Sequence, residues 1–283
     1  MVVLVTGAAG QLGQSLQFIA PDVNYKFIFA NSTDLDITNQ EKVNAFFNVN
    51  TIDFCINAAA YTAVDKAEID IKKAIQINVV GSKNLAIACK NHNVKLIHIS
   101  TDFVFDGNSD IPYLETDTTN PLGIYGQTKL DGEKAVSENL EEYFIIRTSW
   151  VYSQFGNNFM KTMLRLASER DSLSIVSDQI GSPTNAVDLA KAIMQIIAKT
   201  QILEPKSQYG IYNFSNEGKC SWYDFAVEIF RINKVVINVN PIATQAFPTP
   251  AKRPKYSLLD KTKIKSTFGI EIKTWQESLL QTI

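Results

Sequence analysis

Histidine and cysteine are scarce in this sequence. Among 283 residues there are only two histidines, His92 and His98, and three cysteines, Cys55, Cys89 and Cys220. The cysteines lack the spacing of metal ligands, so we expect reduced thiols and no zinc site. With so few histidines, the sequence also disfavours a histidine-based metal site and a Ser-His-Asp triad. No metal ion is therefore predicted.

Neither sign of charge is in excess, and no long apolar run is present. The 27 basic and 29 acidic residues leave a net charge of −2, which argues against a nucleic-acid partner. No apolar run reaches the roughly 20 residues of a membrane-spanning helix, so no membrane partner is expected. The opening residues MVVLVTGAAG lack a basic segment before the apolar one, which favours a cytoplasmic protein over a secreted one.

Short β-branched runs alternate with longer helical patterns through the first 180 residues, which is typical of a doubly wound parallel sheet. The expected strands cover 2–6, 26–30, 52–59, 94–100, 143–150 and 173–177, and the helices between the early strands cover 11–20, 39–49 and 66–92. The C-terminal third is rich in proline, with short strands at 212–215 and 235–242 and a helix at 221–230.

This order predicts a Rossmann-type α/β fold with a smaller C-terminal α/β lobe. A dinucleotide-binding domain would cover residues 1–150, and residues 151–205 would add further strands and helices to it. Residues 206–283 would form most of the lobe that binds the substrate.

Three glycines follow the first strand with a fixed spacing. Gly7, Gly10 and Gly13 lie between that strand and a helix, in the sequence TGAAGQLG. Glycine there allows a tight turn and a close approach of the backbone to a pyrophosphate. The helix that follows offers unpaired N–H groups and a positive dipole to the phosphates. This context predicts a dinucleotide site, and the spacing resembles that of the extended short-chain dehydrogenases/reductases.

A tyrosine and a lysine four residues apart complete a candidate catalytic set. Tyr125 and Lys129 would share one face of a helix, and Thr101 ends the fourth strand. A neighbouring ammonium lowers the pKa of a phenol, so Tyr125 could act as the general acid of a ketone reduction. Thr101 would hold the carbonyl oxygen, and Lys129 would also bind the nicotinamide ribose.

Longer motifs narrow the resemblance. The segments NAAAYTAVDKAE (57–68), STDFVFDG (100–107), TNPLGIYGQTKLDGE (119–133), RTSWVY (147–152) and SDQIGSPT (177–184) resemble the dTDP-4-dehydrorhamnose reductases. The resemblance covers essentially the whole chain. It implies reduction of the C4 ketone of dTDP-4-dehydro-L-rhamnose by NADPH, with NADH as a second cofactor. The product would serve the synthesis of cell-surface polysaccharide.

The resemblance also assigns residues to the two ligands. The cofactor would contact Gly7, Gly10, Gln11, Leu12, Gly13, Asp36, Ile37, Ala58, Ala59, Ala60, Thr62, Tyr125 and Lys129. The dTDP-sugar would contact Val64, Thr101, Asp102, Phe103, Trp150 and Arg253. Trp150 would pack on the hexose, and the guanidinium of Arg253 would suit the diphosphate.

Two local features bear on the cofactor and on assembly. The second strand ends in ANSTD, where Asn31 and Ser32 are polar, Asp34 could approach the ribose and no basic residue is near in sequence. This favours the use of both NADPH and NADH.

Some relatives bridge a dimer through a metal held by acidic residues, but Ser15 stands at one of those positions. We therefore expect a monomer or a weak homodimer without a bridging metal.

Three rival functions fit the same fold. A 4,6-dehydratase would need Asp-Glu after the threonine, whereas Thr101 is followed by Asp102 and Phe103. A sugar-nucleotide epimerase would retain its NAD⁺ throughout the cycle. A non-catalytic subunit, similar to the regulatory subunit of methionine adenosyltransferase, would not need the intact set of Thr101, Tyr125 and Lys129.

Overall fold

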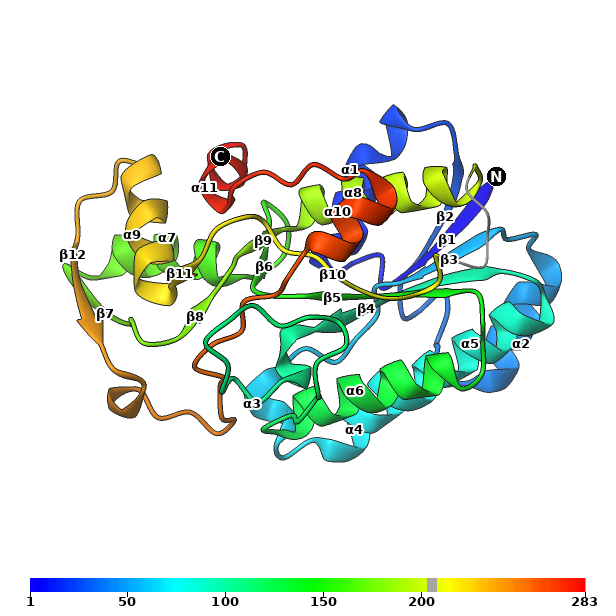
Figure 1. Ribbon diagram of the computed structural model, residues 1–283, viewed down its shortest axis with the longest axis horizontal. Helices are drawn as coiled ribbons and strands as arrows, with labels where there is room; N and C mark the ends of the chain where they lie inside the picture. Colours follow the sequence, from blue (N-terminus) through cyan, green and yellow to red (C-terminus); the bar gives the residue numbers. More distant parts are fainter. Residues whose placement is uncertain (203–207, 283) are drawn as a thin grey trace.

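The centre of the computed structural model, which describes residues 1–202 and 208–282, is a six-stranded sheet. All neighbouring strands are parallel, in the order β10-β5-β4-β3-β1-β2 (Figure 1). The strands are β1 (Val2–Thr6), β2 (Lys26–Ala30), β3 (Phe54–Asn57), β4 (Lys95–Thr101), β5 (Tyr143–Thr148) and β10 (Gly210–Asn213). A sheet of this kind must be covered on both faces, because each strand carries apolar side chains on both sides.

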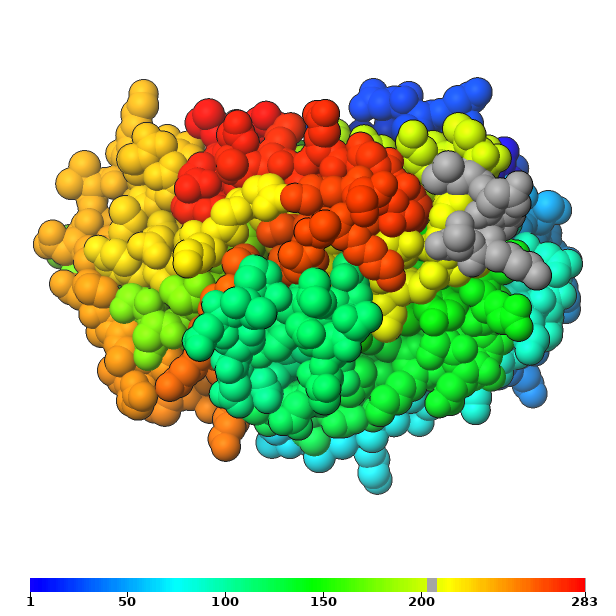
Figure 2. Space-filling model, in the orientation of Figure 1, coloured from blue at the N-terminus to red at the C-terminus, as the bar shows by residue number. Residues whose placement is uncertain are grey.

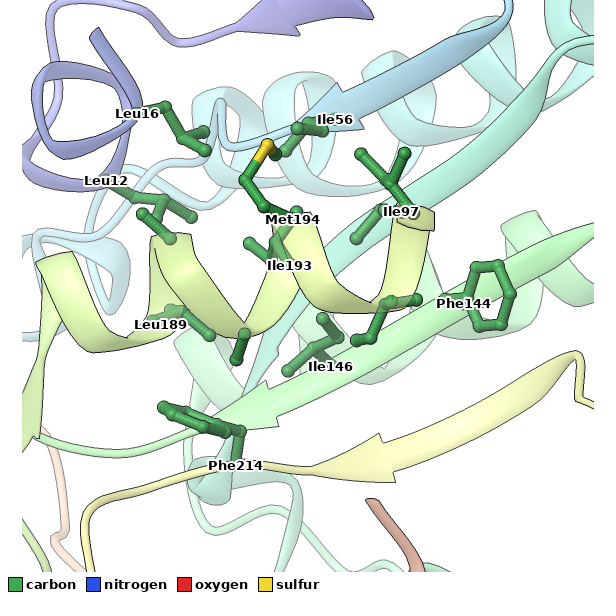
Figure 3. Packing of buried hydrophobic residues seen from close by; sticks show 14 of the residues in the cluster. Leu12, Leu16, Ile56, Ile97, Phe144, Ile146, Leu189, Ile193, Met194 and Phe214 are labelled. Carbon is green, nitrogen blue, oxygen red and sulfur yellow. The ribbon is translucent and has the colours of Figure 1, made fainter. Parts of the chain in front are cut away.

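Three helices cover one face. They are α1 (Gln11–Ile19), α8 (Ala186–Thr200) and α10 (Thr262–Phe268). The side chains of Leu189 and Ile193 on α8 belong to one buried cluster with Leu16 of α1 and Ile146 of β5 (Figure 3). Each fully buried Leu or Ile side chain of this kind contributes roughly 1.5–3 kcal/mol to folding. None of the helices in the described residues has the length and apolarity needed to span a bilayer.

The opposite face is covered by a second group of helices. They are α2 (Gln40–Val49), α3 (Val64–Ala67), α4 (Ile71–Ile75), α5 (Gly81–Asn91) and α6 (Ile124–Ser137). The long helical stretch predicted at about 66–92 is interrupted near its start, because the chain turns after α3; from residue 71 to residue 91, α4, the π-helical stretch η2 (Gln76–Val80) and α5 follow one another directly. There the buried Asn78 side chain bonds both backbone groups of Tyr61. Apolar periodicity carries no signal for such a contact.

The C-terminal lobe forms a separate layer at one end of the molecule (Figure 1). Its helices are α7 (Phe159–Glu169), α9 (Trp222–Ile232) and α11 (Trp275–Leu280). Its strands are β6 (Val151–Tyr152), β7 (Ser172–Val176), β8 (Ile180–Gly181), β9 (Thr184–Asn185), β11 (Cys220–Ser221) and β12 (Asn238–Ile242). Short 3-10 turns are η1 (Ala20–Asp22), η3 (Asp102–Val104) and η5 (Thr244–Ala246). An aromatic cluster around Tyr152, Phe225 and Trp275 forms the core of the lobe.

Two strands exchange places relative to the prediction: one expected in the central sheet lies in the C-terminal lobe, and one expected in the lobe lies in the central sheet. The strand at 173–177 exists as β7, but it pairs with β12 in the lobe rather than joining the central sheet. The strand at 212–215 begins at Gly210 and is the sixth strand of the central sheet, beside β5. The chain therefore passes between the layers more than once. In the space-filling view the C-terminal third, yellow to red, occupies the left end and upper middle of the face shown (Figure 2).

The sheet order determines where a ligand can enter. From β1 the chain moves to β2 on one side, and β3 then lies on the other side of β1. A crevice forms at such a switch point, outside the carboxyl ends of the strands. The predicted Rossmann-type fold with a C-terminal lobe is confirmed, whereas the substrate-binding role assigned to residues 206–283 stays a prediction.

Candidate active site

The turn between β1 and α1 brings its backbone against the end of β3. Gly7 has a φ of +69°, and a Cβ atom there would lie 2.6 Å from the backbone nitrogen of Ala59. A Cβ atom on Gly13 would lie 2.5 Å from the Gly7 carbonyl oxygen. Both positions therefore require glycine. Gly10 precedes α1 and provides no side-chain cap, so the first N–H groups of α1 remain available to an anion.

Two adjoining clefts follow the carboxyl ends of the strands, and both are lined by Ala9, Gly10, Ala58 and Ala60. The larger has a volume of about 740 Å³ and contains Tyr125. The smaller has a volume of about 590 Å³ and lies beyond the glycine turn. Every residue predicted to bind the cofactor except Gly13 lines one of the two clefts.

The smaller cleft contains the two residues predicted to border the adenosine, and one residue that the sequence did not suggest. Asp36 and Ile37 line it as expected, and hydrogen bonds from Thr38 lower the pKa of the Asp36 carboxyl. Lys73, from α4, also lines it, together with Asn31 and Ser32. A basic residue is thus present near the end of β2, although it is distant in sequence.

Thr101, Tyr125 and Lys129 meet in the larger cleft. Thr101 ends β4, and its hydroxyl donates to Oδ1 of Asp102 over 3.1 Å. Tyr125 lies in the first turn of α6 and lines the same cleft. The ring of Phe103 meets the Tyr125 ring edge-on, with centroids 5.5 Å apart. One turn further along α6, the Nζ atom of Lys129 donates to the carbonyl oxygen of Ile99 over 2.6 Å. The structure therefore brings together all three predicted catalytic residues.

The pKa of Tyr125 differs from the expected direction. Burial raises it to about 12, the Thr101 hydroxyl acts to lower it, and the charge of Asp102 raises it further. The Lys129 ammonium, which is bonded to the Ile99 carbonyl oxygen, does not contribute to this shift in the pKa of Tyr125. Burial also lowers the pKa of Lys129 to about 8, against the opposing effect of Glu133. At neutral pH the phenol is consequently protonated, which is the state that a general acid needs.

A buried ion pair between α6 and β5 lies one helical turn from Lys129. Glu133, one turn after Lys129, accepts from Nη2 of Arg147 at 2.7 Å, and both side chains are almost fully buried. The Ser100 hydroxyl also donates to Glu133, and the Arg147 guanidinium lies 5.1 Å from the Phe105 ring centroid. Since each charge is paired, removing either one would leave the other buried without compensation. This pair ties α6 to β5 below the cleft.

An aromatic stack forms the lobe side of the cleft. Trp150 has a φ of +49°, a conformation that is rare and strained for a bulky residue. Its ring stacks on that of Trp222, with centroids 3.6 Å apart and an interplanar angle of 12°. Both line the cleft, but the sequence indicated only Trp150. The sequence held one indication of where Trp222 lies. In Ser221-Trp222-Tyr223-Asp224, the first and last residues form a capping box, which starts α9 at Trp222.

The remaining residues predicted for the substrate, Val64, Asp102, Phe103 and Arg253, also line the larger cleft. The Arg253 guanidinium is paired: its Nη2 atom donates to Asp65 over 2.8 Å, and its Nη1 atom donates to the same carboxylate over 3.1 Å. The sequence gave no indication of this partner. Gln11 is also engaged, since its side chain bonds the Val151 carbonyl, Ser153 and Asn158.

Ser15 lies on the buried side of α1, where its hydroxyl donates to the Gln11 carbonyl over 2.8 Å. Within residues 1–202 and 208–282, no three His, Cys, Asp or Glu side chains are grouped as metal ligands. The expectations of no metal and of a monomer or weak dimer stay predictions.

Comparison with known proteins decides the family. The model of the family described as the RmlD substrate binding domain matches residues 1–283. A dTDP-4-dehydrorhamnose reductase of Aggregatibacter actinomycetemcomitans is 45% identical over 283 residues, covering 98% of this chain and 96% of that protein. The chain belongs to the dTDP-4-dehydrorhamnose reductase family. The resemblance seen in the sequence motifs is thus confirmed.

Solved structures of dTDP-4-dehydrorhamnose reductases have the same fold over their whole length. That of Clostridium acetobutylicum has a TM-score of 0.95 at 44% identity, covering 100% of this chain and 98% of its own. That of Bacillus anthracis, solved in complex with NADP, has a TM-score of 0.93 at 40% identity, covering 99% and 98%. The agreement includes the C-terminal lobe, so both layers of the larger cleft are part of the family fold.

Proposed function

We propose that this chain is an NADPH-dependent oxidoreductase that reduces the C4 ketone of dTDP-4-dehydro-L-rhamnose to dTDP-L-rhamnose. The observation that carries the proposal is the meeting of Thr101, Tyr125 and Lys129 in a cleft that continues over the glycine turn. Membership of the reductase family supports the substrate. The NADP complex of the Bacillus anthracis relative supports the cofactor.

The chain supplies positioning and a proton, and the bound dinucleotide supplies the hydride. Tyr125, protonated at neutral pH, donates its phenolic proton to the C4 oxygen as negative charge develops there. Thr101 donates a second hydrogen bond to the same oxygen. Lys129 holds the nicotinamide ribose, and its ammonium, once turned toward the phenol, stabilises the phenolate that remains.

The other predicted residues take roles along the two clefts. The glycine turn and the start of α1 hold the pyrophosphate, while Asp36 and Ile37 border the adenosine. Trp150, which lines the same cleft as Asp102 and Phe103, packs on the hexose, with Trp222 as its stacking partner. Arg253 binds the diphosphate.

Turnover with enzymatically made dTDP-4-dehydro-L-rhamnose tests the reaction. We expect wild-type protein to consume NADPH, and Tyr125→Phe to lose about 10²–10⁴-fold in kcat because the proton donor is gone. The absorbance of the reduced nicotinamide measures both. Tyr25→Phe, outside both clefts, is the control and should retain full activity. Normal turnover by Tyr125→Phe would show that another group supplies the proton.

The rival functions predict other results in the same preparation. A sugar-nucleotide epimerase or dehydratase would retain tightly bound NAD⁺ through purification, whereas a reductase exchanges its dinucleotide at each turnover. A regulatory subunit would capture an enzyme partner stoichiometrically and show no turnover of its own. Either result would contradict the proposed reduction.

A further inference from the structure

The single turn of helix α3 carries two carboxylates with distant partners. Asp65 lies within α3, and Glu68 is the residue that directly follows the end of α3. The partner of Asp65 is Arg253, in the C-terminal part of the chain, and the partner of Glu68 is the N–H of Ile124, the first residue of α6. Val64, the first residue of this turn, and Thr62, just before it, line the larger cleft. The turn therefore lies beside the cleft and contacts both the catalytic helix and the C-terminal lobe.

Asp65 fixes the guanidinium of Arg253. Its two carboxylate oxygens accept from Nη1 at 3.1 Å and from Nη2 at 2.8 Å, and one of them also accepts from the Ala251 N–H at 3.2 Å. Arg253 further donates from Nη1 to Thr249 and to the Ala251 carbonyl. These contacts hold a planar group whose side chain lines the cleft.

The pairing leaves one bidentate edge of Arg253 unused. A guanidinium has five N–H donors in a rigid plane, and the contacts to Asp65 use the edge formed by Nη1 and Nη2. Within the described residues, no acceptor is paired with the Nε–H or with the second N–H of Nη2. These two donors are parallel on the adjacent edge, a geometry that matches two oxygens of a phosphate. An arginine held by Asp65 can therefore still receive a diphosphate.

Glu68 caps the helix that carries Tyr125. The N-cap residue of α6 is Gly123, which has no side chain to cap the helix. Oε1 of Glu68 accepts from the Ile124 N–H over 2.9 Å instead. A Cβ atom on Gly123 would lie 2.6 Å from that oxygen, so glycine makes the contact possible. A carboxylate at this end also complements the helix dipole, and Tyr125 is the next residue.

We propose that α3 is a positioning element for this active site: Asp65 orients Arg253 for the diphosphate of the substrate, and Glu68 fixes the turn that presents Tyr125. Both are positioning residues, because neither contacts the reacting atoms. The proposal rests on the proposed function in that it assigns a diphosphate to Arg253 and proton donation to Tyr125. It links two groups of the substrate, the ketone and the diphosphate, to one turn of helix.

The Asp65 half is tested by calorimetric binding of dTDP, which needs no turnover. Asp65→Asn has one acceptor oxygen in place of two and no charge, so it cannot form the pair of parallel bonds to Nη1 and Nη2 of Arg253. We therefore expect dTDP affinity and the KM of the sugar nucleotide to worsen about tenfold to a hundredfold. The kcat value should change little. In an Arg253→Ala background, Asp65→Asn should have no further effect, because its partner is already absent.

The Glu68 half is tested by kcat and by hydrogen exchange in the first turn of α6. Glu68→Ala should lower kcat about tenfold to a hundredfold, since a small displacement of a catalytic group is costly, and should speed exchange of the Ile124 amide. Glu68→Gln should restore most of both, because its amide oxygen can still accept that N–H. Glu138→Gln, an exposed carboxylate at the other end of α6, is the control.

The failure of this proposal is distinct from that of the proposed function. Wild-type protein that does not reduce the ketone contradicts the reaction, while dTDP binding and hydrogen exchange still report on α3. Unchanged dTDP affinity in Asp65→Asn overturns the positioning of Arg253. Unchanged kcat and exchange in Glu68→Ala overturn the positioning of Tyr125. A loss that merely follows the fraction of folded protein, measured by thermal unfolding, overturns both.

Discussion

Lys73 is the basic residue best placed to distinguish NADPH from NADH. It lines the smaller cleft with Asn31, Ser32 and Asp36, and its side chain is exposed. The 2′-phosphate distinguishes the two dinucleotides, and an ammonium near it adds a charge-assisted contact. We expect Lys73→Ala to lower kcat/KM for NADPH about 3- to 10-fold, as is usual for an exposed ion pair of about 1 kcal/mol, and to leave NADH unaffected.

The neighbouring Lys72 provides a matched control for Lys73. It is equally exposed on α4 but does not line either cleft, so Lys72→Ala should preserve the preference between the dinucleotides. Equal losses with NADPH and NADH in Lys73→Ala would assign Lys73 to a part that the two cofactors share.

Individual site residues were predictable where the sequence itself held them together. Tyr125 and Lys129 lie four residues apart on one helix, and Gly7 and Gly13 belong to one turn. Lys73 and Trp222 were missed because their places in the clefts depend on how distant elements pack. The pairing of Arg253 with a residue 188 positions away in sequence was unpredictable for the same reason.

Helix α6 lies close to its neighbours because glycine faces them. A Cβ atom on Gly132 would lie 2.3 Å from the Asn78 carbonyl oxygen in the π-helical stretch η2. The methyl group of Gly132→Ala would therefore meet backbone that cannot move alone. We expect a loss of about 1–3 kcal/mol in the free energy of unfolding from overpacking, despite the roughly 1 kcal/mol by which alanine favours a helix over glycine. Urea denaturation measures the change.

The same substitution should also lower kcat, because α6 carries Tyr125 and Lys129. Ser137→Ala, at the exposed end of α6, should change neither stability nor kcat appreciably. An increase in stability for Gly132→Ala would contradict this prediction. It would mean that the backbone of η2 moves away at little cost and that the higher helix propensity of alanine outweighs the overpacking.

Elements with a clear period were predictable, but their pairing was not. The early strands β1 and β2 match the predicted ranges, because a buried parallel strand is a continuous apolar run. The strand β7 has the same kind of sequence, yet it pairs with β12. Local pattern reports that a segment is a strand, while its partner depends on contacts between distant segments.

At the scale of the whole molecule, the active site costs stability that a substitution can recover. Asp102 is buried beside Thr101, and burial raises the pKa of its carboxyl to about 6 from the ordinary 3.8, against the opposing effects of the Ser257 and Thr101 hydroxyls. A carboxyl with a raised folded-state pKa destabilises the fold where it is ionised, above about pH 6. The cost diminishes as the pH falls from 6 toward 4, where the folded protein is protonated first.

We therefore expect Asp102→Asn to stabilise the unliganded protein at pH 7.5 by up to about 3 kcal/mol, and to give little gain near pH 4. Denaturant unfolding at the two pH values measures the difference, and Asp171→Asn, which is exposed, should show none. The same variant should lose affinity for the sugar nucleotide, since Asp102 lines the cleft. A gain in stability coupled to a loss of binding is the relation expected when a buried charge is retained for function rather than for folding. Equal stability of Asp102→Asn and wild type at pH 7.5 would mean that the carboxylate is already compensated within the fold.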